Sequence, residues 1–147
     1  DSVTLEDCIN EYCAIEYMNG QNKYFCERCD SHEEAFNETS VWKLPRFLIF
    51  HFNRFIHNFE ENSINKNDIS VDYPLTNFKF DKCTTPYSDF EYNLNSIICH
   101  HGTTIESGHY TCDVLKNGVW YHLNDEMIEI QPEYKQTPYI LIYEVCK

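Results

Sequence analysis

The sequence predicts an α+β fold, with a mainly antiparallel β-sheet and a short N-terminal helix. Three observations lead to this prediction: a helical periodicity near the N-terminus, several runs of aromatic and β-branched residues after residue 40, and the dipeptide Asn117-Gly118 between two such runs. Strand-forming runs joined by tight turns pair in antiparallel fashion, and a single helix can cover one face of their sheet. The 147 residues have the length of one ordinary domain.

The helix is expected to start just after Thr4. The Thr4 side chain can cap the first turn, and Asp7 places a negative charge near the positive end of the helix. Apolar side chains then recur at the spacing i, i+3, i+4 and i+7, at Leu5, Cys8, Ile9 and Tyr12. This spacing puts them on one face, so we expect a short amphipathic helix.

A Cys-x-x-Cys pair follows the helix, in the segment KYFCERCDSHEEAF. The thiolates of Cys26 and Cys29 have the spacing at which both can bind one tetrahedral zinc ion. A structural zinc site needs four ligands, and Cys8, Cys13 and His32 are the candidates for the other two, although their spacing is not that of a zinc knuckle. We therefore expect either half of a structural zinc site or two packed cysteines.

Strand-like runs fill the chain from Ser40 onward. In order they are SVWKLP, RFLIFHFNRF, ISVDYPL, FEYNLNSIICH, HYTCDVLK, VWYHL and TPYILIYEV. The polar stretch 57–68 predicts a long exposed loop, and DKCTTPYSD and HGTTIESG predict two more. No internal repeat and no Gly-, Ser- or Pro-rich linker divides the chain. We expect one unit, in which residues 1–39 hold the helix and the Cys-x-x-Cys pair and residues 40–147 form the sheet.

The charge and hydropathy of the chain exclude some classes of partner. The chain has 24 acidic and 11 basic residues, a formal charge of −13, and no cluster of Lys and Arg. Such a surface repels phosphate backbones, which excludes nucleic acid as the main partner and favours a basic one. The sequence has no apolar run of 18 residues and no signal-peptide pattern, so we expect a soluble chain without a membrane segment.

The eight cysteines are consistent with two kinds of protein. Cys99 and Cys112 lie in apolar, strand-like runs, where a reduced cysteine packs as a small hydrophobic residue. This placement favours a reduced intracellular protein, in the cytoplasm or the nucleus. The alternative is a secreted domain held by up to four disulfides.

The Asn117-Gly118 hairpin places a histidine and two polar residues at one end of a β-ribbon. If the dipeptide forms a two-residue turn, Thr111 lies opposite Asn124 and His109 lies opposite Glu126. Cross-strand partners share a face of the sheet, as do residues two apart. His109 and Asn124 are then diagonal neighbours, with about 5 to 7 Å between their Cβ atoms, close enough for a side-chain hydrogen bond.

This parity selects Asn124 over Asp125 as the partner of His109, because Asp125 points to the other face unless a bulge swaps the two. An amide oxygen that accepts from one ring nitrogen fixes the tautomer, so the other nitrogen can take a proton. Gly108 beside the histidine permits close approach of another backbone. A histidine on a hairpin is also an ordinary packing residue, and these patterns leave both interpretations open.

Seven blocks, in order, resemble the C-terminal part of the catalytic domain of ubiquitin-specific proteases, the papain-like cysteine deubiquitinases. The blocks are VTLEDCINEY with YFCERC, LPRFLIFHFNRF, VDYPL, FEYNLNSIICHHG, SGHYTCDV, WYHLND and PYILIYE, and they run from Val3 to Glu144. The resemblance implies the palm and part of the fingers of that fold. It also implies ubiquitin or ubiquitinated proteins as partners, and thiolate attack on the bond after ubiquitin's C-terminal glycine.

The resemblance further implies roles for individual residues. His109 would be the catalytic base, Asn124 the third member of the triad, and Asp125 a support for the oxyanion or a water. The HGTTIESG loop and its flanks would lie beside the ubiquitin tail, with substrate contacts from His100, His101, Gly102, Gly108 and Tyr110. No cofactor is implied for catalysis. Family members often complete the zinc site with a second Cys-x-x-Cys pair upstream, at a position before residue 1.

One departure from the family pattern concerns the nucleophile. The family carries its cysteine in a Gly-Asn-Thr-Cys-Tyr block near the start of the domain, and none of the eight cysteines here has that context. Cys112 is three residues from His109 and therefore on the other face of its strand. We therefore expect a segment that is inactive alone and needs the missing N-terminal half of the domain. The alternative is a non-catalytic ubiquitin-binding or scaffold module.

Overall fold

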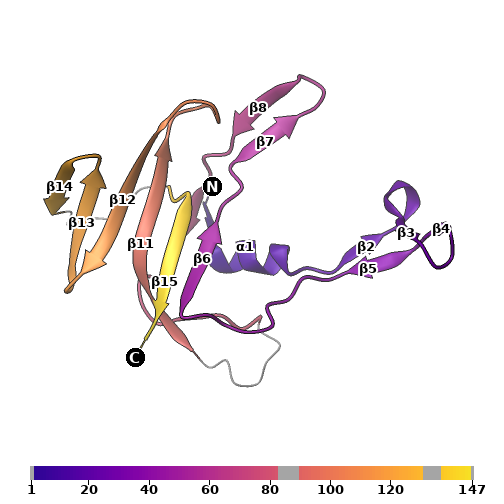
Figure 1. Ribbon diagram of the computed structural model, residues 1–147, viewed down its shortest axis with the longest axis horizontal. Coiled ribbons are helices and arrows are strands. Elements are labelled where there is room, and N and C mark those ends of the chain that lie inside the picture. The colour runs from indigo at the N-terminus through magenta and orange to yellow at the C-terminus, as the bar shows by residue number, and fades with distance from the viewer. Residues whose placement is uncertain (1, 83–89, 131–136, 147) are drawn as a thin grey trace.

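A seven-stranded sheet forms the body of the molecule in the computed structural model, which describes residues 2–82, 90–130 and 137–146 (Figure 1). Its path runs β14-β13-β12-β11-β15-β6, with β10 beside β11, and all of its pairings are antiparallel. The strands are β6 (Phe47–His51), β10 (Phe78–Lys79), β11 (Glu91–His101), β12 (His109–Lys116), β13 (Val119–Asn124), β14 (Met127–Ile130) and β15 (Ile140–Val145). The predicted α+β class with a mainly antiparallel sheet is confirmed.

The core lies against one face of β11 and β15, the two central strands. Tyr92, Leu94, Leu141 and Tyr143 have no exposed surface, and Ile97 is 1% exposed. Alternate residues of these strands point to this face, so one side of each strand is apolar while the other is only partly covered. Burial of this aromatic and aliphatic surface is the main favourable contribution to folding.

The helix α1 (Leu5–Tyr12) covers this core face, as the sequence predicts. The backbone N–H of Asp7 donates to the Thr4 hydroxyl at 3.0 Å, and the backbone N–H of Thr4 donates to the Asp7 carboxylate at 2.9 Å, so a reciprocal capping box starts the helix. Leu5 and Ile9 are its buried residues, whereas Tyr12, which was expected on the same apolar face, is 72% exposed. In front of it, β1 (Ser2–Thr4) pairs in parallel with β9 (Ser70–Asp72).

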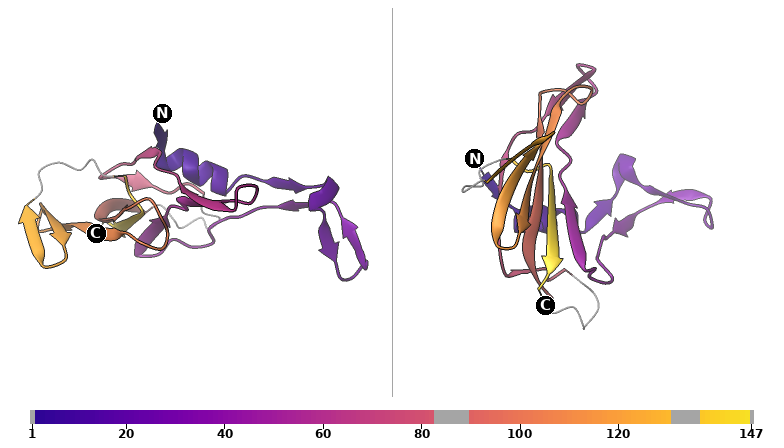
Figure 2. Two further views of the ribbon diagram at one scale, coloured as in Figure 1. Left: turned by 90° about the horizontal axis from the view of Figure 1, so that it is seen from above. Right: turned by 60° about the vertical axis from the view of Figure 1, so that its left-hand side comes forward.

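An arm of short strands projects from the body, as two views show (Figures 1 and 2). Two hairpins follow one another along it, formed by β2 (Glu16–Met18) with β5 (Ala35–Asn37) and by β3 (Tyr24–Cys26) with β4 (Ser31–Glu33), with a 3-10 turn at Gly20–Asn22. The rings of Tyr17 and Phe36 stack across the first hairpin, with centroids 4.9 Å apart. The arm therefore depends on cross-strand pairs rather than on the core of the body.

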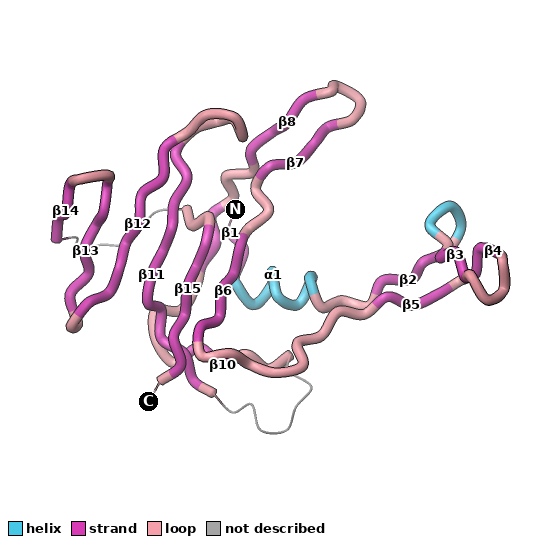
Figure 3. Tube along the Cα trace, in the orientation of Figure 1, coloured by secondary structure: helices cyan, strands magenta, loops and turns pink. Residues whose placement is uncertain are grey.

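The prediction of a loop over residues 57–68 is wrong. Most of that stretch forms a hairpin of β7 (Phe55–Asn58) and β8 (Ser63–Lys66), which extends beyond the sheet (Figure 3). A hairpin that stands away from the core has no buried face, so its sequence lacks the alternation by which strands are recognised. The run RFLIFHFNRF is also not one strand, because β6 ends at His51 and β7 begins at Phe55.

Every cysteine of the described ranges is a free thiol. None of the helices in those ranges has the length and apolar character needed to cross a membrane. The predicted loop DKCTTPYSD falls largely outside the described residues.

Candidate functional site

The β12–β13 hairpin has the predicted register. Lys116 pairs with Val119, and the ladder continues outward to Cys112 and Leu123. Asn117 and Gly118 have φ angles of 53° and 77°, the left-handed conformation that a two-residue turn of this kind requires. Asn-Gly is the dipeptide that adopts this turn most readily, so the local sequence sets the register of the whole ribbon.

His109 and Asn124 are hydrogen-bonded to each other, as the parity of the hairpin predicts. His109 Nε2 lies 2.6 Å from the Asn124 Oδ1, and both side chains are half-buried. Because an amide oxygen can only accept, Nε2 carries the hydrogen and donates it. The ring is then held in one orientation, with Nδ1 as its unprotonated nitrogen, which is the arrangement of a general base and its orienting group.

The predicted pairing of His109 with Glu126 is wrong. The chain turns at Asp125, which has a φ of 52°, and β14 then folds back so that Met127 pairs with Asn124. His109 pairs instead with His101 on β11, and their rings lie 6.3 Å apart. Asp125 is exposed in the turn directly after Asn124.

A row of polar side chains continues inward from His109 on the same sheet face, and sequence reasoning missed it. His101 Nε2 and the Thr111 hydroxyl are 2.8 Å apart. Two residues further along β12, the Asp113 carboxylate lies 2.6 Å from His122 Nδ1. Asp113 is 2% exposed, and His122 is the hydrogen-bond partner of one of its two carboxylate oxygens. The sequence could have predicted this pair, because the same hairpin register that brings His109 next to Asn124 makes Asp113 and His122 cross-strand neighbours.

The 102–108 loop joins β11 to the start of β12 and is packed tightly at its base. A Cβ on Gly108 would lie 2.0 Å from His100 Nε2, and one on Gly102, whose φ is +136°, would lie 2.9 Å from the carbonyl oxygen of Ser107. The hydroxyl of Thr104 reaches the Ser107 hydroxyl at 2.9 Å across the loop. The close approach of a backbone predicted at Gly108 is present at the carbonyl oxygen of His101, 2.8 Å from such a Cβ, but the nearest group is the imidazole of His100.

The predicted substrate-contact residues divide into two groups in the structure. His100 is only 7% exposed and lies under the loop, in contact with the aromatic rings of Phe55, Tyr110 and Tyr139. Burial lowers the pKa of His100, and the positive charge of Lys66 lowers it further. The other four, His101, Gly102, Gly108 and Tyr110, lie at the surface.

A cavity of about 430 Å³ opens beside this loop. Its lining comes from the end of β8, from the end of β11 and from the start of the loop, and it includes Lys66, Asp68, Cys99, His100, His101 and Thr137. It therefore lies along the segment that leads to His109.

The cysteines nearest to His109 in the sheet do not have the character of nucleophiles. Cys99 is 2% exposed, and burial together with the charge of Asp113 raises its pKa to about 12. Burial also raises the pKa of Cys112, which lies on the opposite face of β12 from His109. Both side chains stay protonated thiols at neutral pH, whereas a nucleophile must be a thiolate.

Cys26 and Cys29 lie at the turn of the β3–β4 hairpin in the arm. The backbone N–H of Cys29 donates to the Cys26 carbonyl at 3.2 Å. The pKa of Cys26 is lowered by the backbone N–H of Cys29, then by the Cys29 thiol and the backbone N–H of Arg28. This turn fits half of a tetrahedral zinc site. Within the described ranges no cluster of three or more metal-binding side chains surrounds it, and Cys8 and Cys13 lie at α1 on the body.

The chain is similar to known proteins in sequence and in fold. Residues 6–143 match the family model described as ubiquitin carboxyl-terminal hydrolase. Ubiquitin carboxyl-terminal hydrolase 3 of Homo sapiens is 30% identical over 150 residues, covering 95% of this chain and 28% of that protein. Ubiquitin carboxyl-terminal hydrolase 4 of Eremothecium gossypii is 33% identical over 163 residues, covering 95% of this chain and 18% of that protein.

A solved structure has the same fold. The SAGA Ubp8/Sgf11/Sus1/Sgf73 DUB module bound to ubiquitin aldehyde contains a chain that is 27% identical, with a TM-score of 0.81 over 100% of this chain and 34% of that one. This chain thus spans about a third or less of the proteins that it resembles. The sheet, the short helix and the family match together lead to one conclusion: the chain belongs to the ubiquitin carboxyl-terminal hydrolase family, with the fold of the ubiquitin-specific protease catalytic domain.

Proposed function

We propose that this chain supplies the catalytic base, its orienting amide and the tail-binding side of a cysteine-type deubiquitinase. The observation that carries the proposal is the hydrogen bond of 2.6 Å between His109 Nε2 and Asn124 Oδ1. It leaves Nδ1 as the nitrogen able to accept a proton. We propose that Asp125, in the exposed turn that follows, supports the oxyanion or an attacking water.

In this mechanism the His109 Nδ1 takes the proton of a cysteine thiol, and the thiolate attacks the carbonyl carbon after the last glycine of ubiquitin. The imidazolium then returns its proton to the leaving amine, and an acyl-enzyme thioester remains. Water, deprotonated by the same histidine, hydrolyses that thioester and frees both ubiquitin and the thiol. Asn124 keeps the ring oriented through both steps.

The nucleophilic thiol is proposed to come from sequence outside these 147 residues, so that the chain alone is inactive. Two observations support this: Cys99 is buried with its pKa raised to about 12, and Cys112 faces away from His109. The related proteins are also three or more times longer than the matched segment.

The proposed substrate is ubiquitin joined through its C-terminal glycine to another protein. The tail would lie along the 102–108 loop, in contact with His101, Gly102, Gly108 and Tyr110, while His100 supports the loop from below. The formal charge of −13 favours the arginine-bearing tail that the family binds. Action on such conjugates belongs to the cytoplasm or the nucleus, which we propose as the location.

Cys26 and Cys29 are proposed to hold half of a structural zinc site in the arm. Zinc there would fix the β3–β4 turn and take no part in hydrolysis, because structural sites have all four positions filled by protein. The remaining two ligands would come from sequence outside this chain.

A second candidate function is a non-catalytic ubiquitin-binding module. It is favoured by one observation, namely that none of the eight cysteines has the family's nucleophile context. Such a module would keep the loop and the tail contacts but would not turn over ubiquitin conjugates even in its full-length form.

The experiment that separates these functions uses ubiquitin that carries an electrophile at its C-terminus. We expect covalent labelling of the full-length protein and none of the 147-residue chain alone. His109→Ala in the full-length protein should abolish labelling while leaving non-covalent binding of ubiquitin intact. Labelling of the isolated chain would disprove an external nucleophile, and a full-length protein that binds ubiquitin but stays unlabelled would establish the binding module.

A further inference from the structure

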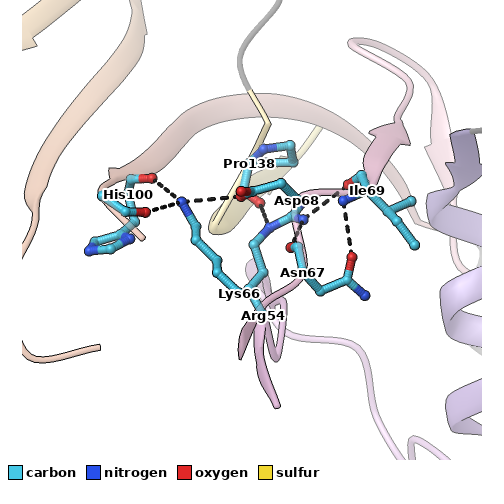
Figure 4. A network of polar contacts seen from close by, with 8 residues as sticks. Arg54, Lys66, Asn67, Asp68, Ile69, His100 and Pro138 are labelled. Carbon is cyan, nitrogen blue, oxygen red and sulfur yellow. Dashed lines mark hydrogen bonds and ion pairs between the residues drawn. The ribbon is translucent and has the colours of Figure 1, made fainter. Parts of the chain in front are cut away.

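Two cations, the buried Arg54 and the largely covered Lys66, lie at the base of the β7–β8 hairpin and bind backbone carbonyls of neighbouring segments (Figure 4). Arg54, 5% exposed, donates to the carbonyl oxygens of Pro138 at 2.8 Å, Asn67 at 2.8 Å and Ile69 at 3.0 Å. It thus ties the hairpin to the segment before β15 and to the chain that leads into β9. Lys66 binds in the other direction, toward the functional site.

The Lys66 ammonium has three protons and three acceptors. Nζ donates to the carbonyl oxygens of His100 and Gly102, each at 2.9 Å, and lies 3.2 Å from the Asp68 carboxylate. The Lys66 side chain is only 10% exposed, whereas that of Asp68 is 63% exposed. A cation held in this way is committed to backbone acceptors, because its exposed ion pair contributes little by comparison.

The two carbonyls that Lys66 binds are those at the start of the 102–108 loop. At the other end of the loop, Gly108 rests on the His100 ring, and a Cβ there would lie 2.0 Å from His100 Nε2. His109 follows directly. The backbone that delivers His109 to its position is therefore fixed at its entry by Lys66 and at its exit by the imidazole.

We propose that Lys66 is a positioning residue for the hydrolytic reaction, because it joins the β7–β8 hairpin to the 102–108 loop and so fixes the backbone that carries His109. The inference rests on the proposed function for its catalytic consequence. Lys66 touches neither the substrate nor the reacting atoms in this role. Without its ammonium, the carbonyls of His100 and Gly102 lose their shared donor, and hairpin and loop are free to move separately.

The test compares Lys66→Met with the wild-type full-length enzyme. Methionine keeps an apolar stem of similar length and removes the three donors. We expect faster amide hydrogen exchange over residues 103–108, unchanged exchange in β15, and a fall in kcat of about 10- to 100-fold, as expected for a misplaced reacting group. Lys66→Arg, which restores a cationic donor, should recover part of kcat.

Two matched variants separate the carbonyl bonds from the ion pair. Asp68→Asn removes the carboxylate and leaves both carbonyl bonds, so it should leave kcat within about twofold. Lys79→Met removes a cation from an exposed ion pair with Glu91 at 3.1 Å, and it should change neither the exchange nor kcat. If Lys66→Met does not fold, Lys66→Gln, which keeps a polar end with fewer donors, should give the same two effects to a smaller degree.

The outcomes distinguish this inference from the proposed function. Unchanged exchange over residues 103–108 in Lys66→Met would overturn the link between hairpin and loop. Faster exchange with wild-type kcat would overturn the positioning role. Because exchange needs no catalysis, a wild-type enzyme without hydrolytic activity would disprove the proposed function, while the exchange comparison would still decide whether Lys66 holds the loop.

Discussion

Removal of the Asn124 amide is the sharpest perturbation of the proposed site. In Asn124→Ala the acceptor at 2.6 Å from His109 Nε2 is lost, and the backbone and the Asn-Gly turn that set the register stay in place. The ring then rotates, and either nitrogen can carry the hydrogen. Because both side chains are half-buried, water replaces part of the bond, and the fold should lose no more than about 1 kcal/mol.

The size of the catalytic loss follows from the energy of this bond. A hydrogen bond with a net value of about 1 to 1.5 kcal/mol corresponds to a population ratio of about 5 to 13. The oriented tautomer should become rarer by at least that factor, so kcat/KM should fall at least about fivefold. The upper limit is the whole contribution of a general base, about 10²- to 10⁴-fold. Asn124→Asp keeps an acceptor oxygen and should retain more activity than Asn124→Ala.

The assay is hydrolysis of a fluorogenic ubiquitin C-terminal amide by the full-length enzyme, with thermal melting to confirm that each variant folds. A loss of less than twofold in Asn124→Ala would refute the orienting role. A larger loss in Asp125→Ala than in Asn124→Ala would transfer that role to the carboxylate in the turn.

Three other predictions concern stability and metal content. The lowered pKa of His100 means that below about pH 6.5 the unfolded chain binds a proton that the folded chain refuses. The free energy of unfolding should therefore fall as pH drops through that range, and His100→Gln should flatten the slope measured by denaturant titration at several pH values. Leu141→Ala, at a site with no exposed surface, should cost about 2 to 5 kcal/mol in the same titration, whereas Ile130→Ala at 70% exposure should cost less than about 0.5. Cys26→Ser or Cys29→Ser should lower the zinc content of the purified full-length protein by about one ion per molecule. Equal zinc content in the wild type and both variants would refute the half-site.

The pairing of His109 with Asn124 could be predicted because it depends on short-range geometry. A two-residue turn fixes the register of every cross-strand pair that follows it, and the alternation of faces along each strand determines which side chains share a face. The prediction fails two residues later, at Glu126, because Asp125 adopts a left-handed conformation and β14 turns back. Period and parity give no information on where a ladder ends.

The β7–β8 hairpin could not be predicted in the same way. Its base is held by Arg54 and Lys66. Arg54 donates to the carbonyl of Pro138 and Lys66 to those of His100 and Gly102, and each acceptor lies more than 30 residues from its donor in the sequence. The residues around Lys66 give no sign that its side chain is only 10% exposed. A polar run that contains such a lysine has the same sequence pattern as an exposed loop. The burial of His100 beneath the loop could not be predicted either, because it depends on tertiary contacts with residues distant in the sequence, such as Phe55 and Tyr139.

The position of β15 in the sheet has a consequence for how the chain folds. This strand is the last of the sequence in the sheet, yet it lies between β11 and β6 and pairs with both. Until it is in place, β6 has no neighbour through which to join β11. During synthesis the sheet therefore cannot close before β15 has left the ribosome, and the long-range pairings make closure slow. Deletion of β15 should leave β6 and the β11–β14 ribbon as separate, aggregation-prone edges.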